Sequence, residues 1–222
     1  MSAKKTKERR TSNEDREYRN FEITLRSKEE RTEEDSYLVE GYASTFKKYL
    51  MWSFDGVDYY EQIDPKAFDG CDMSDVVFRV DHEGMVYART KAGTVELSVD
   101  DKGLFTKTDL SKTADARNLF EHIEAGDYYQ MSFAFTVPEG GDEYDEKTHT
   151  RTIRHIDKLY DVSPVSFPAN PDTDIAPSAR DFFHGVMEKE KAERLEAERR
   201  ELRKKKLQLR KRLLLATLGG MK

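Results

Sequence analysis

Short runs in which apolar and polar residues alternate fill the chain from about residue 20 to residue 182. A period of two predicts half-buried β-strands, and glycine or aspartate turns separate many of the runs. The predicted strands are residues 21–26, 37–46, 76–82, 85–90, 93–100, 103–110, 130–137 and 151–160. We therefore expect a mainly β domain of the α+β class, folded as a closed or nearly closed β-barrel flanked by helices.

Other segments depart from this period. Residues 112–127 have apolar positions at helical spacing, and a short helix is also predicted over residues 64–70, which open with a proline. Residues 183–222 consist mostly of strong helix formers and predict a charged helical extension. Residues 1–19 are polar without periodicity and predict a disordered arm, so residues 20–182 form the folded domain.

Charge is distributed unevenly along the 222 residues. Residues 183–222 contain 13 Lys/Arg and 6 Asp/Glu, whereas residues 1–182 contain 25 Lys/Arg and 38 Asp/Glu. An acidic body does not favour nucleic-acid binding, because phosphate contacts need clustered cations. A solvated helix is the simpler interpretation of the basic tail, with an acidic partner or nucleic acid as the alternative.

The composition narrows the location and the chemistry. A single cysteine, Cys71, allows no internal disulfide and fits a reducing cytoplasm. We expect no transmembrane helix, because no run of about 18 apolar residues occurs. The basic N-terminal stretch lacks the apolar region of a secretory signal. No cluster of His, Cys and Asp has the spacing of metal ligands, so we expect neither a metal nor a cofactor.

The first candidate for a catalytic residue is the serine in the run YYQMSFAFTV at residues 128–137. Alternation places Ser132 on a face of small and polar residues, opposite a stripe of Met and Phe. A serine hydroxyl on that face is available to meet a substrate. It becomes a nucleophile when a neighbouring base takes its proton and an acceptor orients that base.

Among the five histidines, His82 is the first candidate for the base. It ends a run of core-facing positions on one strand and precedes a Glu83-Gly84 turn, where the interior meets solvent. The orienting acceptor is either Asp157 or Asp161, and His155 is placed on the same predicted strand. Spacing alone leaves these choices open.

The order of four stretches resembles the prohead maturation proteases of tailed bacteriophages. These stretches are VDH (80–82), GTVELSVDDKGLFTKTDL (93–110), YYQMSFAFTV (128–137) and LYDVSPVSFPANPDTDIAPSAR (159–180). The resemblance covers about residues 21–182 and implies a serine endopeptidase similar in fold to the herpesvirus assemblins. It implies that residues 20–182 form the protease domain, with Ser132 as nucleophile and His82 as general base.

The third member of the site stays open. The family usually has a glutamate where this chain has Asp161. The assemblins use a second histidine, which keeps His155 as an alternative, and Asp157 is the third candidate. The proline-rich stretch after Asp161 is expected to be an ordered loop able to present a backbone N–H to an oxyanion.

The resemblance also implies substrates and partners. These are the major capsid protein or its scaffold-like arm, the scaffold, and the protease itself through autoproteolysis. The implied location is the immature phage head inside the host cytoplasm, and a homodimer or higher oligomer is possible. Nucleic acid and membrane are not expected partners.

Two other functions remain open. A catalytically inactive scaffold or assembly protein would use the helical tail and the N-terminal arm. A cysteine hydrolase using Cys71 is disfavoured, because the acidic FDGCDMSD stretch opposes the thiolate.

Overall fold

The computed structural model describes residues 16–24, 37–166 and 177–219. The chain divides into two compact units, residues 1–179 and residues 180–222. The described elements, in chain order, are β1 (Glu17–Thr24), β2 (Leu38–Thr45), β3 (Tyr49–Phe54), β4 (Val57–Ile63), β5 (Val77–Val80), β6 (Glu83–Arg89), the 3-10 helix η3 (Thr90–Ala92), β7 (Val95–Val99), β8 (Gly103–Asp109), α1 (Ala114–Ala125), β9 (Gln130–Thr136), β10 (Asp142–Asp145), β11 (Thr150–Ile153), β12 (Lys158–Val165) and α2 (Pro177–Gly219).

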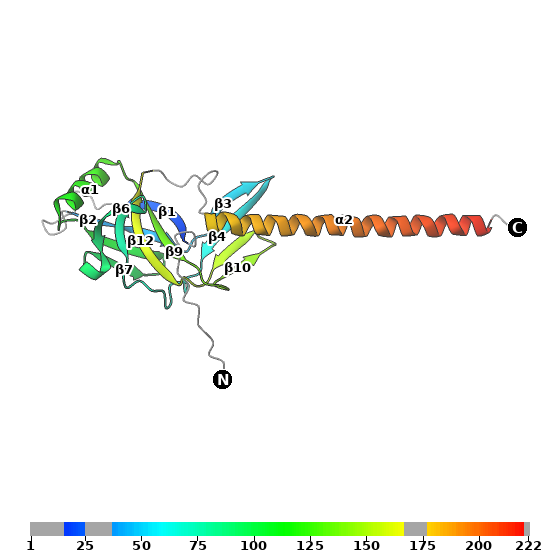
Figure 1. Cartoon of the computed structure of the whole chain (residues 1–222), viewed down its shortest axis with the longest axis horizontal. Helices are drawn as coiled ribbons and strands as arrows, with labels where there is room; N and C mark the ends of the chain where they lie inside the picture. Colours follow the sequence, from blue (N-terminus) through cyan, green and yellow to red (C-terminus); the bar gives the residue numbers. More distant parts are fainter. Residues whose placement is uncertain (1–15, 25–36, 167–176, 220–222) are drawn as a thin grey trace, which may run out of the picture. The chain divides into compact units, whose positions relative to one another are not determined.

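The strands form two sheets (Figure 1). The first has the order β6-β5-β12-β9-β1-β2-β8-β7, and the second has the order β10-β11-β4-β3. The mainly β prediction is confirmed, but neither sheet of the described residues closes into the expected barrel. Strands β6 and β7 are the two edges of the large sheet and do not pair with each other. The 3-10 helix η3 connects them in the chain.

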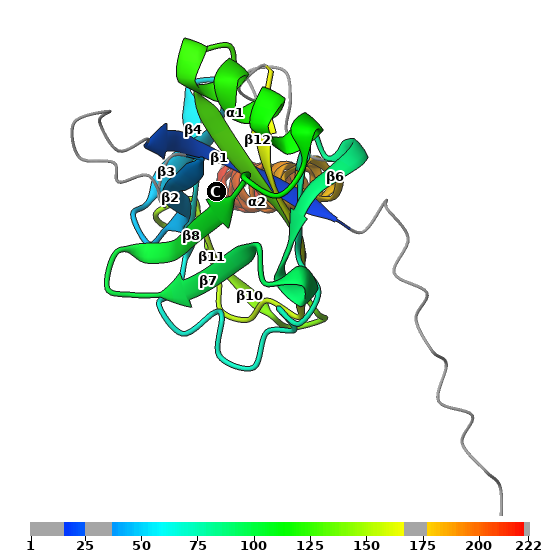
Figure 2. The ribbon, with the colours of Figure 1, turned by 90° about the vertical axis from the view of Figure 1, so that its left-hand side faces the viewer.

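An apolar core fills the interior of the first unit, around which the strands of the large sheet curve (Figure 2). Met131, Phe133 and Phe135 of β9 are fully buried in it. Helix α1, which was predicted, adds one apolar face to this core. Thr113 caps the helix by accepting a hydrogen bond from the Ala116 N–H at 3.1 Å.

Several local predictions need correction. Residues 49–63 form the β3–β4 hairpin, which the alternation did not reveal. Strands β10 and β11 form a further hairpin, and β10 was not among the predicted strands. Residues 65–70 form a series of hydrogen-bonded turns and not a short helix. The predicted strand at 151–160 is two strands, β11 and β12, with residues 154–157 between them.

Pro164 was expected to exclude regular pairing, yet it belongs to β12 and lies opposite Met131. Its carbonyl accepts a hydrogen bond from the Asp81 N–H at 3.0 Å, on the side of β5. The backbone nitrogen and carbonyl of one strand residue point to the same neighbouring strand. On that side of Pro164 the neighbour β5 has already ended at Val80, so no strand residue of β5 needs the N–H that proline lacks. The proline therefore costs the sheet little.

A cluster of buried charges, the Glu17 cluster, lies between the two sheets. Arg151 donates to both carboxylate oxygens of Glu17, at 2.7 and 2.8 Å. Arg19 donates to Glu17 at 2.7 Å and to Glu61 at 2.6 Å. The four residues are at most 4% exposed. Paired in this way the buried charges are satisfied, and they join β1 to β4 and β11.

This cluster also corrects the predicted arm. Most of residues 1–19 lies outside the described residues, but Glu17, Tyr18 and Arg19 belong to β1. The second unit is almost entirely helix α2, which contains the predicted helical tail from residue 183 to residue 219. Leu195, Leu202 and Leu209 of α2 recur every seven residues and are about half exposed. No described helix is long and apolar enough to cross a membrane.

Candidate active site

The pairing of β9 with its two neighbours lines up residues from distant parts of the chain. Asp161 of β12 is opposite Ala134 of β9, which is opposite Tyr18 of β1. Residues opposite each other in paired strands point to the same face of a sheet. These three residues form one row, which we call the Asp161 row.

Ser132 belongs to the next row on the same face, about 7 Å along the strand. In that row Ser163 of β12 lies opposite Ser132 of β9. The Met and Phe side chains of β9 point to the other face and belong to the core. The alternation predicted for this strand is thus confirmed, and it places Ser132 beside the row that contains Asp161.

The hydroxyl of Ser132 is buried and has no hydrogen bond. Its residue is 1% exposed, and its Oγ has no partner among the described residues. Leaving a buried hydroxyl unpaired costs roughly 1–3 kcal/mol, so the position calls for an explanation. The sequence predicted a serine open to substrate, and the structure shows a covered one.

His82 reaches the Asp161 row from the turn between β5 and β6. The strand pairing ends with Val80 opposite Glu83, so Asp81 and His82 form a two-residue turn. Their φ values are 49° and 60°, the signs of a type I′ turn. The sequence extended the β5 strand through His82 and placed its ring on the core face, which is wrong. The turn ends the alternation and brings the ring to the opposite side.

The imidazole of His82 is paired with a buried carboxylate. Its Nδ1 lies 2.6 Å from Asp161 Oδ1, and the Asp161 side chain is 2% exposed. The same oxygen accepts a hydrogen bond from Ser163 Oγ at 2.6 Å. An ionised carboxylate only accepts, so this contact favours the neutral tautomer with the proton on Nδ1, in which Nε2 has a lone pair for use as a base.

Tyr18 packs against the same imidazole. The two ring centroids are 4.4 Å apart, with 56° between the ring planes. Burial and the charge of Asp161 raise the pKa of Tyr18, so its phenol stays neutral. The ring therefore contributes to the orientation of His82 by contact.

Three hydrogen bonds hold the backbone of this turn. The Asp81 carboxylate accepts from the Ser166 N–H at 2.8 Å and from Ser166 Oγ at 2.6 Å. The Asp81 N–H donates to Pro164. Together they tie the turn that carries His82 to the end of the strand that carries Asp161, and we call this arrangement the Asp81 clamp.

The other two candidates for the third member lie elsewhere. His155 and Asp157 are in the segment between β11 and β12, and His155 is not on a strand. The Asp157 N–H donates to the carbonyl of Thr136, the last residue of β9. The His155 N–H donates to Gly141. Both residues are thus placed at the far end of β9 from Ser132.

Two other histidines and Cys71 have different surroundings. His122 Nδ1 lies 2.8 Å from the exposed Asp127 carboxylate, and His149 Nδ1 lies 3.2 Å from the Tyr144 hydroxyl. Burial, together with the charges of nearby aspartates, raises the pKa of Cys71 to about 12. In the part of the chain that the structure describes, no group of three His, Cys, Asp or Glu residues is placed to hold a metal.

Four contributors were missed from the sequence. Tyr18 was assigned to the disordered arm, and Asp81, Ser163 and Ser166 were given no role. The spacing of Ser163 two residues after Asp161 was a usable signal, because both then share one face of a strand. Nothing in the sequence indicated the contacts of Tyr18 and Ser166, which depend on pairing between distant segments.

Apart from Tyr18, the residues of this arrangement fall within a match to a known family. Residues 21–188 match the model of the caudovirus prohead serine protease family. The chain belongs to this family. No curated protein and no solved structure gives a significant match. Membership in the family indicates a serine protease associated with the phage prohead in the host cell.

Proposed function

We propose that the protein is a serine endopeptidase that cleaves capsid assembly proteins during prohead maturation. The observation that carries the proposal is the His82–Asp161 pair, in the row next to Ser132 of a chain that belongs to the prohead serine protease family. The expected substrates are the scaffold or the scaffold-like arm of the major capsid protein, and the protease itself.

In this mechanism His82 Nε2 accepts the Ser132 hydroxyl proton while Ser132 Oγ bonds to the scissile carbonyl carbon. The C–N bond then breaks, and His82 gives the proton to the leaving amine. Water then attacks the acyl carbon while His82 takes one of its protons. The bond between Ser132 Oγ and the acyl carbon breaks, His82 returns the proton to Oγ, and the acid product leaves. Asp161 keeps the imidazole in the correct tautomer and stabilises its charged form.

Two steps depend on groups around the serine. Because Ser132 is 1% exposed, the groups that cover it must move when substrate binds. The oxyanion donor was expected in the segment after β12. The Ser166 N–H already donates a hydrogen bond to Asp81 at 2.8 Å, so this N–H is occupied. The rest of that segment, residues 167–176, lies outside the described residues.

Assembly in cells tests this function. The phage capsid protein is expressed with wild-type protein, with Ser132→Ala or with Ser163→Ala, and the capsid protein from purified proheads is weighed by mass spectrometry. We expect full processing with wild type, partial processing with Ser163→Ala and none with Ser132→Ala. Heads that mature normally with Ser132→Ala would instead indicate an inactive assembly protein that acts through its tail.

A further inference from the structure

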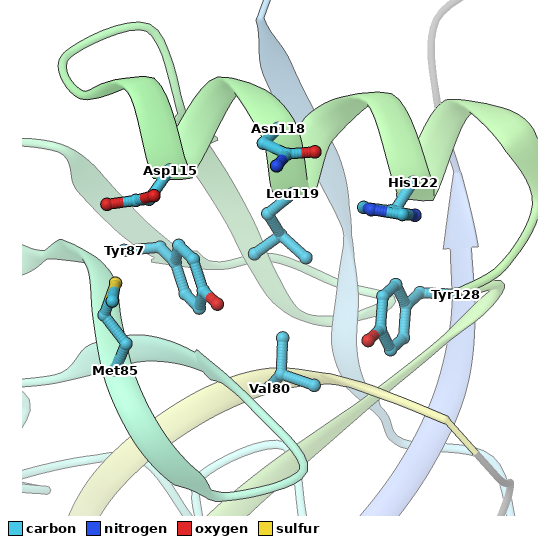
Figure 3. A pocket seen from close by; sticks show the side chains of 8 residues that line it. All are labelled: Val80, Met85, Tyr87, Asp115, Asn118, Leu119, His122 and Tyr128. Carbon is cyan, nitrogen blue, oxygen red and sulfur yellow. The ribbon is translucent and has the colours of Figure 1, made fainter.

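A pocket lies between helix α1 and the β5–β6 hairpin, whose turn contains His82 (Figure 3). Its volume is about 260 Å³. This is below the roughly 300–1,000 Å³ of pockets that hold drug-sized ligands, and it suits a single side chain. The residues that line it are Val80, Met85, Tyr87, Asp115, Asn118, Leu119, His122 and Tyr128.

The pocket shares its supporting strands with the proposed site. Val80 immediately precedes the Asp81–His82 turn, and Met85 follows it on β6. Tyr128 lies four residues before Ser132, just ahead of β9. Val80 and Tyr128 pack against the core, whereas Ser132 faces away from it, so a substrate whose bond lies at Ser132 reaches the pocket by crossing the end of the sheet where β5 ends and β9 begins. A peptide in extended form advances roughly 3.3 Å per residue.

An unpaired strand edge borders the same pocket. Strand β6 is an edge of the large sheet, and it presents Met85, 55% exposed, and Val86, 41% exposed, beside the turn of His82. Exposed strand edges bind extended peptides through main-chain hydrogen bonds. Strands β5 and β12 separate β6 from β9, so a segment bound at this edge belongs to a part of the substrate away from the cut bond.

The lining combines apolar walls with one carboxylate. Leu119, 4% exposed, forms the floor, and the rings of Tyr87 and Tyr128 stand on either side of it (Figure 3). Asp115 lies on the rim and makes no ion pair with any described residue. The nearby His122 is already paired with Asp127 at 2.8 Å. The fixed charge of the lining is therefore negative.

Such a lining suits a long side chain with an apolar stem and a cationic end. The stem of Lys or Arg packs on leucine and tyrosine, the cation interacts with the aromatic faces, and its charge pairs with a carboxylate. The net negative charge of residues 1–182, which contain 38 acidic and only 25 basic residues, also favours a basic ligand. The basic stretch at residues 203–206 of the tail supplies side chains of this class.

We propose that this pocket binds a Lys or Arg side chain of the polypeptide being cleaved, with Asp115 as the residue that selects its charge. The assignment rests on the proposed endopeptidase activity and adds a specificity for basic substrates. It predicts that cleavage sites share a basic residue at a constant distance from the cut bond.

Cleavage-site profiling tests the proposal. Full-length protein is incubated with a library of peptides cut from a proteome by a Glu-specific protease, and the new termini are mapped by mass spectrometry. Wild type should enrich Lys and Arg at one position. Asp115→Asn should lower kcat/KM for such peptides by about tenfold or more, while peptides with Met at that position change little. Asp115→Lys should shift the preference to Asp and Glu.

Glu121→Gln is the matched control, because Glu121 is an exposed carboxylate on the same helix outside the pocket. Cleavage without a basic preference, or an equal effect of Asp115→Asn and Glu121→Gln, would overturn the pocket assignment alone. If only the capsid protein is cut, its own cut sites must show the basic residue. Wild type that cuts neither library nor capsid protein would overturn the proposed function and this inference with it.

Discussion

His82 Nδ1 lies 2.6 Å from Asp161 Oδ1, although the two residues are 79 positions apart in the chain. Parallel pairing of β5 with β12 brings them together, and the turn after β5 directs the imidazole toward the carboxylate. The carboxylate is buried and also accepts a hydrogen bond from Ser163. This pair is the best-defined part of the proposed catalytic site.

Asp161→Asn should lower kcat by roughly 10³- to 10⁴-fold while the protein stays folded. The amide can donate to Nδ1, which favours the wrong imidazole tautomer, so Nε2 no longer accepts the Ser132 proton. Cleavage rates on the capsid protein and thermal unfolding measure the two effects. Asp157→Asn and His155→Ala are the matched variants and should keep near wild-type rates. A larger loss with either of these would move the third catalytic role away from Asp161.

The Asp81 clamp should affect catalysis more than stability. Asp81→Ala removes the acceptor of two hydrogen bonds from Ser166 and frees the turn of His82. We expect kcat to fall about 10- to 100-fold with KM within about twofold, because positioning of the base changes while substrate contacts do not. Asp81→Asn keeps one acceptor oxygen and should recover part of the rate.

The β3–β4 hairpin offers a matched control for this variant. Asp55 begins a two-residue turn there with φ of 50°, like Asp81 with 49°. Asp55→Ala should have the same backbone cost at a site on the other sheet, with no change in kcat. Equal kinetic effects of the two substitutions would show that Asp81 has no positioning role.

The Glu17 cluster should stabilise the fold strongly. Glu17→Gln leaves the buried guanidinium groups of Arg19 and Arg151 short of negative charge, and we expect the free energy of unfolding to fall by about 3–5 kcal/mol. Denaturant unfolding monitored by circular dichroism measures this. Glu143→Gln, in an exposed pair with Arg154, should change it by less than about 1 kcal/mol. Similar losses from both substitutions would contradict a special role for the buried cluster.

The Glu17 cluster should also make the stability of the fold depend on pH. Burial opposes ionisation of Glu17, but the hydrogen bond from Arg151 and the charges of Arg19 and Arg151 outweigh it and lower the pKa from 4.5 to about 2. The stabilisation is therefore complete above about pH 4.5 and is lost as pH falls toward 2. Unfolding curves of wild type between these values should show a slope that Glu17→Gln reduces. An unchanged slope would place the acid sensitivity elsewhere.

Cys71→Ala should keep kcat/KM within about twofold of wild type. The pKa of about 12 leaves almost no thiolate at neutral pH, and the thiolate is the nucleophilic form. Iodoacetamide should likewise leave proteolysis intact, as measured by capsid protein cleavage. Loss of activity in both experiments would support the cysteine hydrolase alternative.

Alternation predicted most strands of the large sheet, because one face of each of those strands packs on the core. It missed β3 and β4, where aromatic residues occupy both faces, although Asp55-Gly56 is a recognisable hairpin signal. It also carried the β5 pattern through a turn and so placed His82 on the wrong face. The two charged residues Glu17 and Arg19 suggested solvent exposure, and their partners Glu61 and Arg151 lie at least 42 positions away.

The candidate site was also only partly predictable from the sequence. Ser132, His82 and Asp161 were found by residue type and by resemblance to the family. Their supporting contacts follow from strand register, which sequence periodicity does not fix between distant strands. Ser163 follows from its spacing to Asp161, whereas Tyr18 and Ser166 become visible only when β1 and the end of β12 are in place.

The proposed activity depends on Ser132 as the nucleophile of an endopeptidase. Its most direct test is incubation of the purified capsid protein with purified wild-type protein and, in parallel, with Ser132→Ala, followed by intact-mass measurement of the products. We expect defined capsid fragments with wild type and uncut capsid protein with Ser132→Ala. Equal cleavage by both proteins would contradict it.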